Sequence, residues 1–398
     1  MLHMFDIVFF QRGFRPFFLC ASAYSILLLG IWVFLYSFGG EFLMLDHAML
    51  QHAPYHMHEM IFGFIIAVMA GFLLTAIPNW TGIKPVAGWK LAFLLLLWLL
   101  GRLAFYLDVA WLDTLIAEGG GIWVLRLMAL AFYPFFFLSV SLDLIRSKNK
   151  RNYIFIFVAL MIGVLDAGYL FSQDIRIIYF AVMMIMLVIS LIGGRVIPSF
   201  TLNSLHTEKE NRHIVNKPQI PLDIAAIASI FLVAIALVMD SHSLLLSLLS
   251  LVSCALHLIR MKNFHTPKVM DKPILWILHM GYLWMTFGLF MLFLSYFIAI
   301  PLETIMHVFT VGSMGSMTLG MMTRVTLGHS QQPIISQDMM IIAFYCMQCA
   351  TIIRVFPVML MQEDLWLWVM ISSIFWVISH GLFLLSHIKL LLGLHHEF

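Results

Sequence analysis

Twelve long apolar stretches follow one another along this chain of 398 residues, with polar segments between them. A helix needs about 20 residues to cross a lipid bilayer, and each stretch is near that length. The pattern predicts an all-α, polytopic integral membrane bundle of about twelve transmembrane helices, in a single domain over residues 1–398. The expected spans are 14–38, 56–78, 88–107, 122–146, 152–172, 175–198, 222–240, 242–260, 273–299, 303–328, 338–360 and 363–388.

The composition supports a membrane protein. Hydrophobic residues make up 62% of the chain and charged residues 11%, with a mean hydropathy of +0.99. A soluble domain of this size would need more charge to cover its surface, so the lipid bilayer is the expected surrounding. No nucleotide-binding or nucleic-acid-binding motif occurs, and the N-terminal segment leads into a full-length span, which does not indicate a cleavable signal peptide.

Lysine and arginine gather in every second connection along the chain. They occupy 12–15, 84–90, 146–151, 195–217 and 260–272, and then positions 324 and 389. The alternate connections are acidic, and Arg176 is their one basic residue. Because basic loops stay in the cytoplasm, both termini are expected there, together with the polar connection 199–221 between spans six and seven.

Histidines and one glutamate crowd around the start of the second span. The segment HAPYHMHEM contains His56, His58 and Glu59, which are candidate metal ligands because imidazole and carboxylate groups bind transition metals. On an ideal helix His56 and His58 point to roughly opposite sides, so one metal would reach both only if the helix began later. The alternative is that they form a polar cap at the outer membrane surface, as expected for His47 and His52.

His307 opens the tenth span, also on the expected outer side. The spacing His-x4-Gly-x7-Gly that follows His58 recurs after His307. Imidazole is the usual ligand of haem iron and a good ligand of copper. Two histidines at equal depth on different helices would suit a haem clamped between them, which makes His58 and His307 a candidate pair. The alternative is that the repeated small residues only allow close helix packing.

Three arginines fall inside predicted spans, near their outer ends: Arg102, Arg126 and Arg354. A guanidinium group pairs well with a carboxylate, so these arginines are candidates for binding the propionates of a haem. The alternative is that they extend to the membrane surface or pair with the acidic residues of one outer loop, Asp108, Asp113 and Glu118.

A second group of histidines lies towards the expected cytoplasmic side. His279 in span nine and His329 at the end of span ten are further candidate metal ligands, with His380 and His257 at similar depth. A lone histidine inside a helical bundle is more often a hydrogen-bonded packing residue. The sequence leaves both interpretations open for this group.

Four segments of the chain carry long motifs: QRGFRPFF at 11–18, HMHEMIFGFIIAVMAGFLLTAIPNWTG at 56–82, LHMGYLW at 278–284 and HVFTVGSMGSMTLGMMTRVTLGH at 307–329. Together these segments closely resemble the NnrS family. These are bacterial inner-membrane proteins with about twelve spans, associated with the response to nitric oxide and described as containing haem and copper. The resemblance implies that haem, copper and nitric oxide are the partners of this chain, and it places His58, Glu59, His279, His307 and His329 at motif positions.

Three functions are compatible with these observations. The first is a haem- and copper-binding protein of the bacterial inner (cytoplasmic) membrane that protects against nitric oxide. The second is a secondary transporter, because twelve spans divided six and six are common among transporters. The third is a quinol-linked membrane oxidoreductase. None of the predicted spans contains an adjacent His-His pair, and spans six and seven contain no histidine, so a centre of the haem-copper oxidase type is not supported.

Overall fold

The computed structural model describes residues 7–38, 52–116, 118–207, 209–216, 219–360 and 364–394. Twelve helices within these ranges are long and apolar enough to cross a membrane, and the described residues include no strand. The prediction of an all-α bundle with twelve membrane-spanning helices is therefore confirmed. The spans are Phe14–Phe34, Pro54–Thr81, Trp89–Tyr106, Gly120–Arg146, Lys150–Ser172, Ile175–Leu205, Ile220–Met239, Leu244–Lys268, Pro273–Leu294, Leu302–His329, Asp338–Leu360 and Leu365–Leu392.

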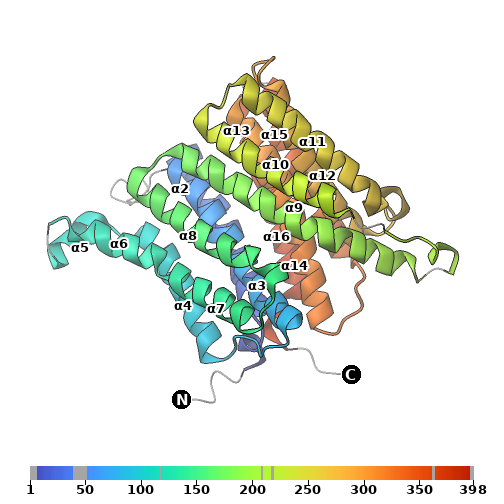
Figure 1. The fold of residues 1–398 in the computed structure, drawn as a ribbon. Helices are drawn as coiled ribbons and strands as arrows, with labels where there is room; N and C mark the ends of the chain where they lie inside the picture. The colour runs from blue at the N-terminus through green and yellow to red at the C-terminus, as the bar shows by residue number, and fades with distance from the viewer. Residues whose placement is uncertain are drawn as a thin grey trace. The chain divides into compact units, whose positions relative to one another are not determined.

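Several spans consist of more than one helical segment (Figure 1). The second span is divided into α2, a π-helical segment η5 and α3, and the tenth into α13, a π-helical segment η11 and α14. The segments are α1 (Phe14–Phe38), α2 (His52–His58), η5 (Glu59–Ile65), α3 (Ile66–Thr81), α4 (Trp89–Leu103), α5 (Val109–Leu115), α6 (Gly120–Leu130), α7 (Phe132–Arg146), α8 (Ile154–Ser172), α9 (Ile175–Leu205), α10 (Ile220–Met239), α11 (Leu244–Met261), α12 (Pro273–Leu294), α13 (Leu302–His307), η11 (Val308–Gly315), α14 (Ser316–His329), α15 (Asp338–Leu360) and α16 (Leu365–Leu392).

Several boundaries differ from the hydropathy pattern, and α12 ends at Leu294 rather than at residue 299. Helix α9 continues to Leu205, so the polar connection after span six is shorter than expected. The short helix α5 lies in the connection before span four, where no helix was predicted. Its N-cap is Asp108, whose carboxylate accepts a hydrogen bond from the Trp111 backbone N–H. This cap satisfies one of the backbone donors that the start of a helix leaves unpaired.

The chain forms two compact units, each described by itself below. The first unit comprises Met1–Ile178, Val325–Gln332 and Leu384–Phe398, and the second comprises Tyr179–Arg324 and Pro333–Phe383. The secondary-structure elements among the described residues of each unit are all helices. Whether the chain folds as the single domain expected from its sequence stays a prediction.

In the first unit, α3 is packed between α1 and α7. The contact with α1 depends on Gly71, since a Cβ at that position would lie 2.7 Å from the ring of Phe18. The start of α1 is held by Thr75, whose hydroxyl accepts a hydrogen bond from the Phe14 backbone N–H (2.9 Å). Arg15 donates to the carbonyl of Leu390 (2.7 Å). The QRGFRPFF segment therefore anchors the N-terminal helix of this unit.

The turn between α8 and α9 contains one exposed ion pair. The guanidinium of Arg176 donates to both carboxylate oxygens of Asp174, with a shortest distance of 2.6 Å. These hydrogen bonds hold the pKa of the Asp174 carboxyl below its usual value. Arg176, the one basic residue of the acidic connections, is thus neutralised by a neighbour in the same turn.

In the second unit, α11 packs against α10 and α12, and η11 packs against α12 and α15. Small residues allow the close approach, because a Cβ at Gly312 would lie 2.8 Å from the side chain of Trp284. Trp284 in turn donates its indole N–H to Gln348 (2.8 Å), and Gln348 donates to the hydroxyl of Ser316 (2.9 Å). The glycines of the tenth span therefore serve helix packing in this unit.

Candidate functional site

The second span changes its helical form at the point where its histidines and glutamate occur. Helix α2 ends at His58, and the π-helical segment η5 begins at Glu59. A π-helical turn contains an additional residue and is common at functional sites. His58 and Glu59 are both 0% exposed, so two consecutive polar side chains enter the interior of the first unit.

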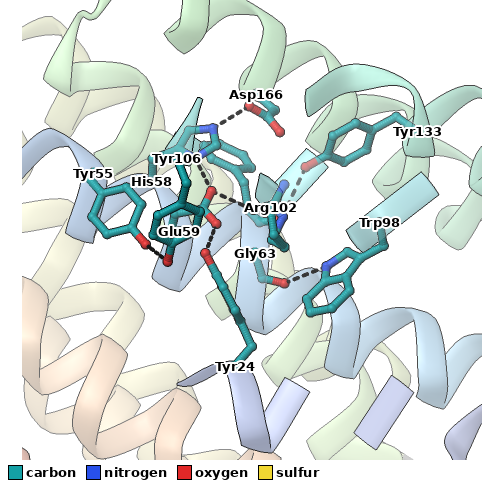
Figure 2. A network of polar contacts seen from close by, with 11 residues as sticks. Tyr24, Tyr55, His58, Glu59, Gly63, Trp98, Arg102, Tyr106, Tyr133 and Asp166 are labelled. Carbon is teal, nitrogen blue, oxygen red and sulfur yellow. Dashed lines mark hydrogen bonds and ion pairs between the residues drawn. The ribbon is translucent and has the colours of Figure 1, made fainter. Parts of the chain in front are cut away.

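Glu59 is the centre of a buried polar cluster (Figure 2). Its Oε1 accepts a hydrogen bond from Arg102 Nη1 (2.5 Å) and lies 2.8 Å from His58 Nδ1. Its Oε2 accepts a hydrogen bond from the hydroxyl of Tyr24. Three different partners therefore share one carboxylate, and together they satisfy both of its oxygens.

The second ring nitrogen of His58 meets another carboxylate. His58 Nε2 lies 2.7 Å from Asp166 Oδ1, and Asp166 is also 0% exposed. The imidazole is thus placed between Glu59 on one side and Asp166 on the other. Asp166 belongs to α8, which links the fifth span to the second.

The cluster combines charges of both signs in a region away from water. It contains two carboxylates, the guanidinium of Arg102 and the imidazole of His58. An isolated charge in such an interior is costly, whereas opposite charges that hydrogen-bond one another are tolerated. Since Tyr24 lies on α1 and Arg102 on α4, the cluster joins four spans of the first unit. Ionisable groups inside a membrane bundle commonly mark a functional site.

Glycine and aromatic residues surround the cluster. A Cβ at Gly63 would lie 2.7 Å from Arg102 Nη1, and the carbonyl of Gly63 accepts a hydrogen bond from the indole of Trp98 (3.1 Å). The hydroxyls of Tyr55 and Tyr106 share a hydrogen bond beside Glu59, as Figure 2 shows. The absence of a side chain at Gly63 is therefore required for Arg102 to reach Glu59.

The other candidate residues of the first unit lie outside this cluster. His56 is half-buried and stacks on Trp32, with ring centroids 4.4 Å apart. Arg126 lies over the ring of Phe171 at 4.7 Å. The ring of His329 lies 5.9 Å from that of Phe14. His47 and the side chain of His52 lie outside the described residues.

The three outer arginines have different surroundings. Arg102 pairs with Glu59 rather than with the loop carboxylates Asp108 and Asp113, which accept hydrogen bonds from backbone N–H groups. Arg126 contacts aromatic rings, and Arg354 is half-buried in α15 of the second unit. Their convergence on the propionates of a haem stays a prediction.

The candidate ligands of the second unit lie in two places. His307 Nδ1–H donates to the carbonyl of Glu303 (2.6 Å), one turn earlier in the same helix. His279 lies between two hydroxyls, with Nε2 3.0 Å from Thr201 and Nδ1 2.8 Å from Thr266. Because His58 belongs to the first unit and His307 to the second, their predicted pairing stays a prediction.

A second buried polar cluster was not expected from the sequence. Arg260 donates from Nε to Asp223 (2.6 Å) and from Nη1 to the carbonyl of Ser190 (2.7 Å) and the hydroxyl of Tyr282 (3.1 Å). Tyr282 donates to His257 Nδ1 (2.8 Å), and His257 Nε2–H donates to a backbone carbonyl of α10. His257 is thus a hydrogen-bonded packing residue, the alternative that the sequence had left open.

Comparison with known families identifies the chain. A family model described as NnrS protein matches residues 8–394. The chain belongs to the NnrS family. A comparison with curated proteins found no match. The resemblance inferred from the four motifs is confirmed, and the NnrS match includes both His58 and His307.

The candidate metal-ligating side chains can be compared with what the haem and copper implied by the NnrS resemblance would require. Among the described residues, no group of three or more His, Cys, Asp and Glu side chains is arranged to hold a metal ion. A metal-ligating histidine usually donates its other ring N–H to a carboxylate or carbonyl. His307 has that geometry on one nitrogen, whereas His58 has a carboxylate on each nitrogen. The contact at Nδ1 of His307 is the kind found behind a metal-bound histidine, whereas the carboxylates on both nitrogens of His58 do not fit a metal there.

Proposed function

We propose that this NnrS family member is a multi-pass protein of the bacterial inner (cytoplasmic) membrane that takes part in the response to nitric oxide and protects against nitrosative stress. The family match over residues 8–394 is the observation that carries the proposal. Twelve helices able to cross a bilayer support it, since they require a membrane location.

Haem and copper are the cofactors in this proposal, and the support for them is the resemblance to the family. His307 would be one ligand, because the carbonyl of Glu303 accepts its Nδ1–H and so directs Nε2 towards a metal. Arg354, which belongs to the same unit as His307, would serve a haem propionate. A bound haem or copper would supply a redox-active centre with affinity for nitric oxide. The polypeptide would orient His307 through its helix.

The first experiment measures cofactors and protection together. Purified protein from cells supplied with haem precursors and copper is expected to show a Soret band and bound copper. A strain lacking the gene is expected to grow poorly under a nitric oxide donor, and the wild-type gene should restore growth. His307→Gln should lose most of one cofactor, because no other side chain would replace the imidazole.

The matched control is His213→Gln, since His213 is an exposed histidine outside the spans. This variant should keep full cofactor content and full protection. Wild-type protein without either cofactor would reject the cofactor proposal. Full cofactor content in His307→Gln would reject His307 as a ligand, and unchanged growth of the deletion strain would reject the protective role.

Secondary transport is a second candidate function, favoured by the buried charges of the first unit. Glu59, Asp166 and Arg102 lie inside spans and are almost fully buried, as is common at the coupling sites of transporters. The same optical and metal measurements separate the two functions. A protein that protects cells but carries neither haem nor copper would favour transport.

The orientation of the chain belongs to the proposal as well. Reporter fusions within 148–151 and 209–212 are expected to be active as cytoplasmic fusions, because the basic residues of these connections stay on the cytoplasmic side. Fusions within 112–116 should report the outer side. The measurement is the ratio of a cytoplasm-active to a periplasm-active reporter at each site. The reverse ratio at these sites would place both termini outside.

A further inference from the structure

Both ring nitrogens of His58 are within hydrogen-bonding distance of carboxylates of the same chain. Nδ1 lies 2.8 Å from Glu59 and Nε2 lies 2.7 Å from Asp166 (Figure 2). The imidazole and both carboxylates are 0% exposed. No ring nitrogen of His58 therefore points towards an open position in the first unit.

A metal bound to His58 would have to displace one of these carboxylates. Displacement of Glu59 would also remove the partner of Arg102 and of Tyr24. Displacement of Asp166 would leave its charge in the interior, where an unpaired carboxylate is unfavourable. His307 differs, since the structure places the carbonyl of Glu303 at Nδ1, the usual arrangement behind a metal-binding Nε2.

The backbone around the cluster is shaped for the same contacts. The π-helical segment begins at Glu59 and places this residue and His58 in the interior together. Gly63, within that segment, leaves the space that Arg102 occupies. The change of helical form thus serves an ion-pair network inside the first unit.

We infer that His58 and Glu59 have a structural role: they hold α1, the second span, α4 and α8 together through one ion-pair network. Haem and copper then bind to other side chains. The second half of this inference rests on the proposed function, whereas the first half does not. The residues His58 and Glu59, within the family segment at 56–82, then have a structural role in this chain.

The test uses four purified full-length variants: His58→Gln, Asp166→Asn, the double variant and His307→Gln. For each, the thermal unfolding midpoint and the haem and copper content per folded protein are measured. His58→Gln should unfold several degrees below wild type, because an imidazole that donates to a carboxylate from each ring nitrogen carries a positive charge. Without that charge, two buried carboxylates face one guanidinium. Adding Asp166→Asn should recover most of that loss, since Glu59 and Arg102 then remain as a neutral pair. Folded His58→Gln should keep the wild-type cofactor content.

His307→Gln is expected to show the opposite pattern, with a midpoint near wild type and a loss of cofactor. The inference is overturned if the double variant is no more stable, and folds no better, than His58→Gln. It is also overturned if His58→Gln keeps the wild-type midpoint while losing its cofactors. If wild type itself binds neither cofactor, the proposed cofactors fail, and the recovery by Asp166→Asn still decides the network.

Discussion

Replacement of Arg102 by glutamine is expected to lower the free energy of unfolding by about 3–5 kcal/mol, the usual effect of removing one partner from a buried ion pair. Arg102 is 5% exposed, and its guanidinium donates to Glu59 at 2.5 Å. Without it, Glu59 and Asp166 would remain as two buried carboxylates near a single imidazole. The measurement is chemical unfolding in detergent, together with the amount of protein inserted in membranes.

Arg126→Gln is the matched control for Arg102. Its guanidinium lies over Phe171 and Trp123, and a cation–π contact at a partly exposed site contributes about 0.5–1 kcal/mol. The loss should therefore be several times smaller than for Arg102. Adding Glu59→Gln to Arg102→Gln should recover part of the stability, because the excess carboxylate is removed. Equal losses at Arg102 and Arg126, without recovery, would show that the buried pair contributes little.

The transmembrane fold could be predicted because it depends on few physical requirements. A helix needs about 20 apolar residues to cross a bilayer, and each of the twelve apolar stretches of the sequence has about that length. All twelve spans occur close to the expected ranges. The differences at α5 and at the end of α9 lie at polar ends where hydropathy no longer decides the structure. The ninth span, in contrast, ends at Leu294 within an apolar stretch that was predicted to continue to residue 299.

The partners within the site could be predicted only in part. The sequence pointed to His58, Glu59 and Arg102 separately, because each is unusual within or beside an apolar span. It did not connect them, since Asp166 lies 108 positions from His58 and periodicity carries no information about which spans meet. Asp166 is itself a carboxylate within an apolar stretch, and that signal could have identified it.

The π-helical form within the second and tenth spans could not be predicted from the sequence either. The repeated spacing of histidine and glycine was visible, and in the structure a π-helical segment follows directly after His58 and after His307. A π-helical turn changes the direction of successive side chains without changing their hydropathy. The ideal-helix argument, which placed His56 and His58 on roughly opposite sides, therefore did not extend to Glu59, where the π-helical segment begins.

Introduction of a methyl group at Gly194 is expected to destabilise the second unit by about 3 kcal/mol or more. A Cβ at this position of α9 would overlap the guanidinium of Arg260. Arg260 is held there by hydrogen bonds to Asp223, to Ser190 and to Tyr282. A hydrogen bond to a charged group contributes about 1.5–3 kcal/mol, and a displaced guanidinium would lose several. The measurement is the unfolding free energy of Gly194→Ala in detergent.

Two comparisons separate this effect from a general sensitivity of membrane helices to substitution. Gly381 on α16 has no atom within 4 Å of an added Cβ, so Gly381→Ala should be neutral or stabilising by up to about 1 kcal/mol through helix propensity. In an Arg260→Met background, Gly194→Ala should cost much less, because the guanidinium that it displaces is gone. A cost of Gly194→Ala that is the same with Arg260 and with methionine would mean that the clash with Arg260 is not its cause.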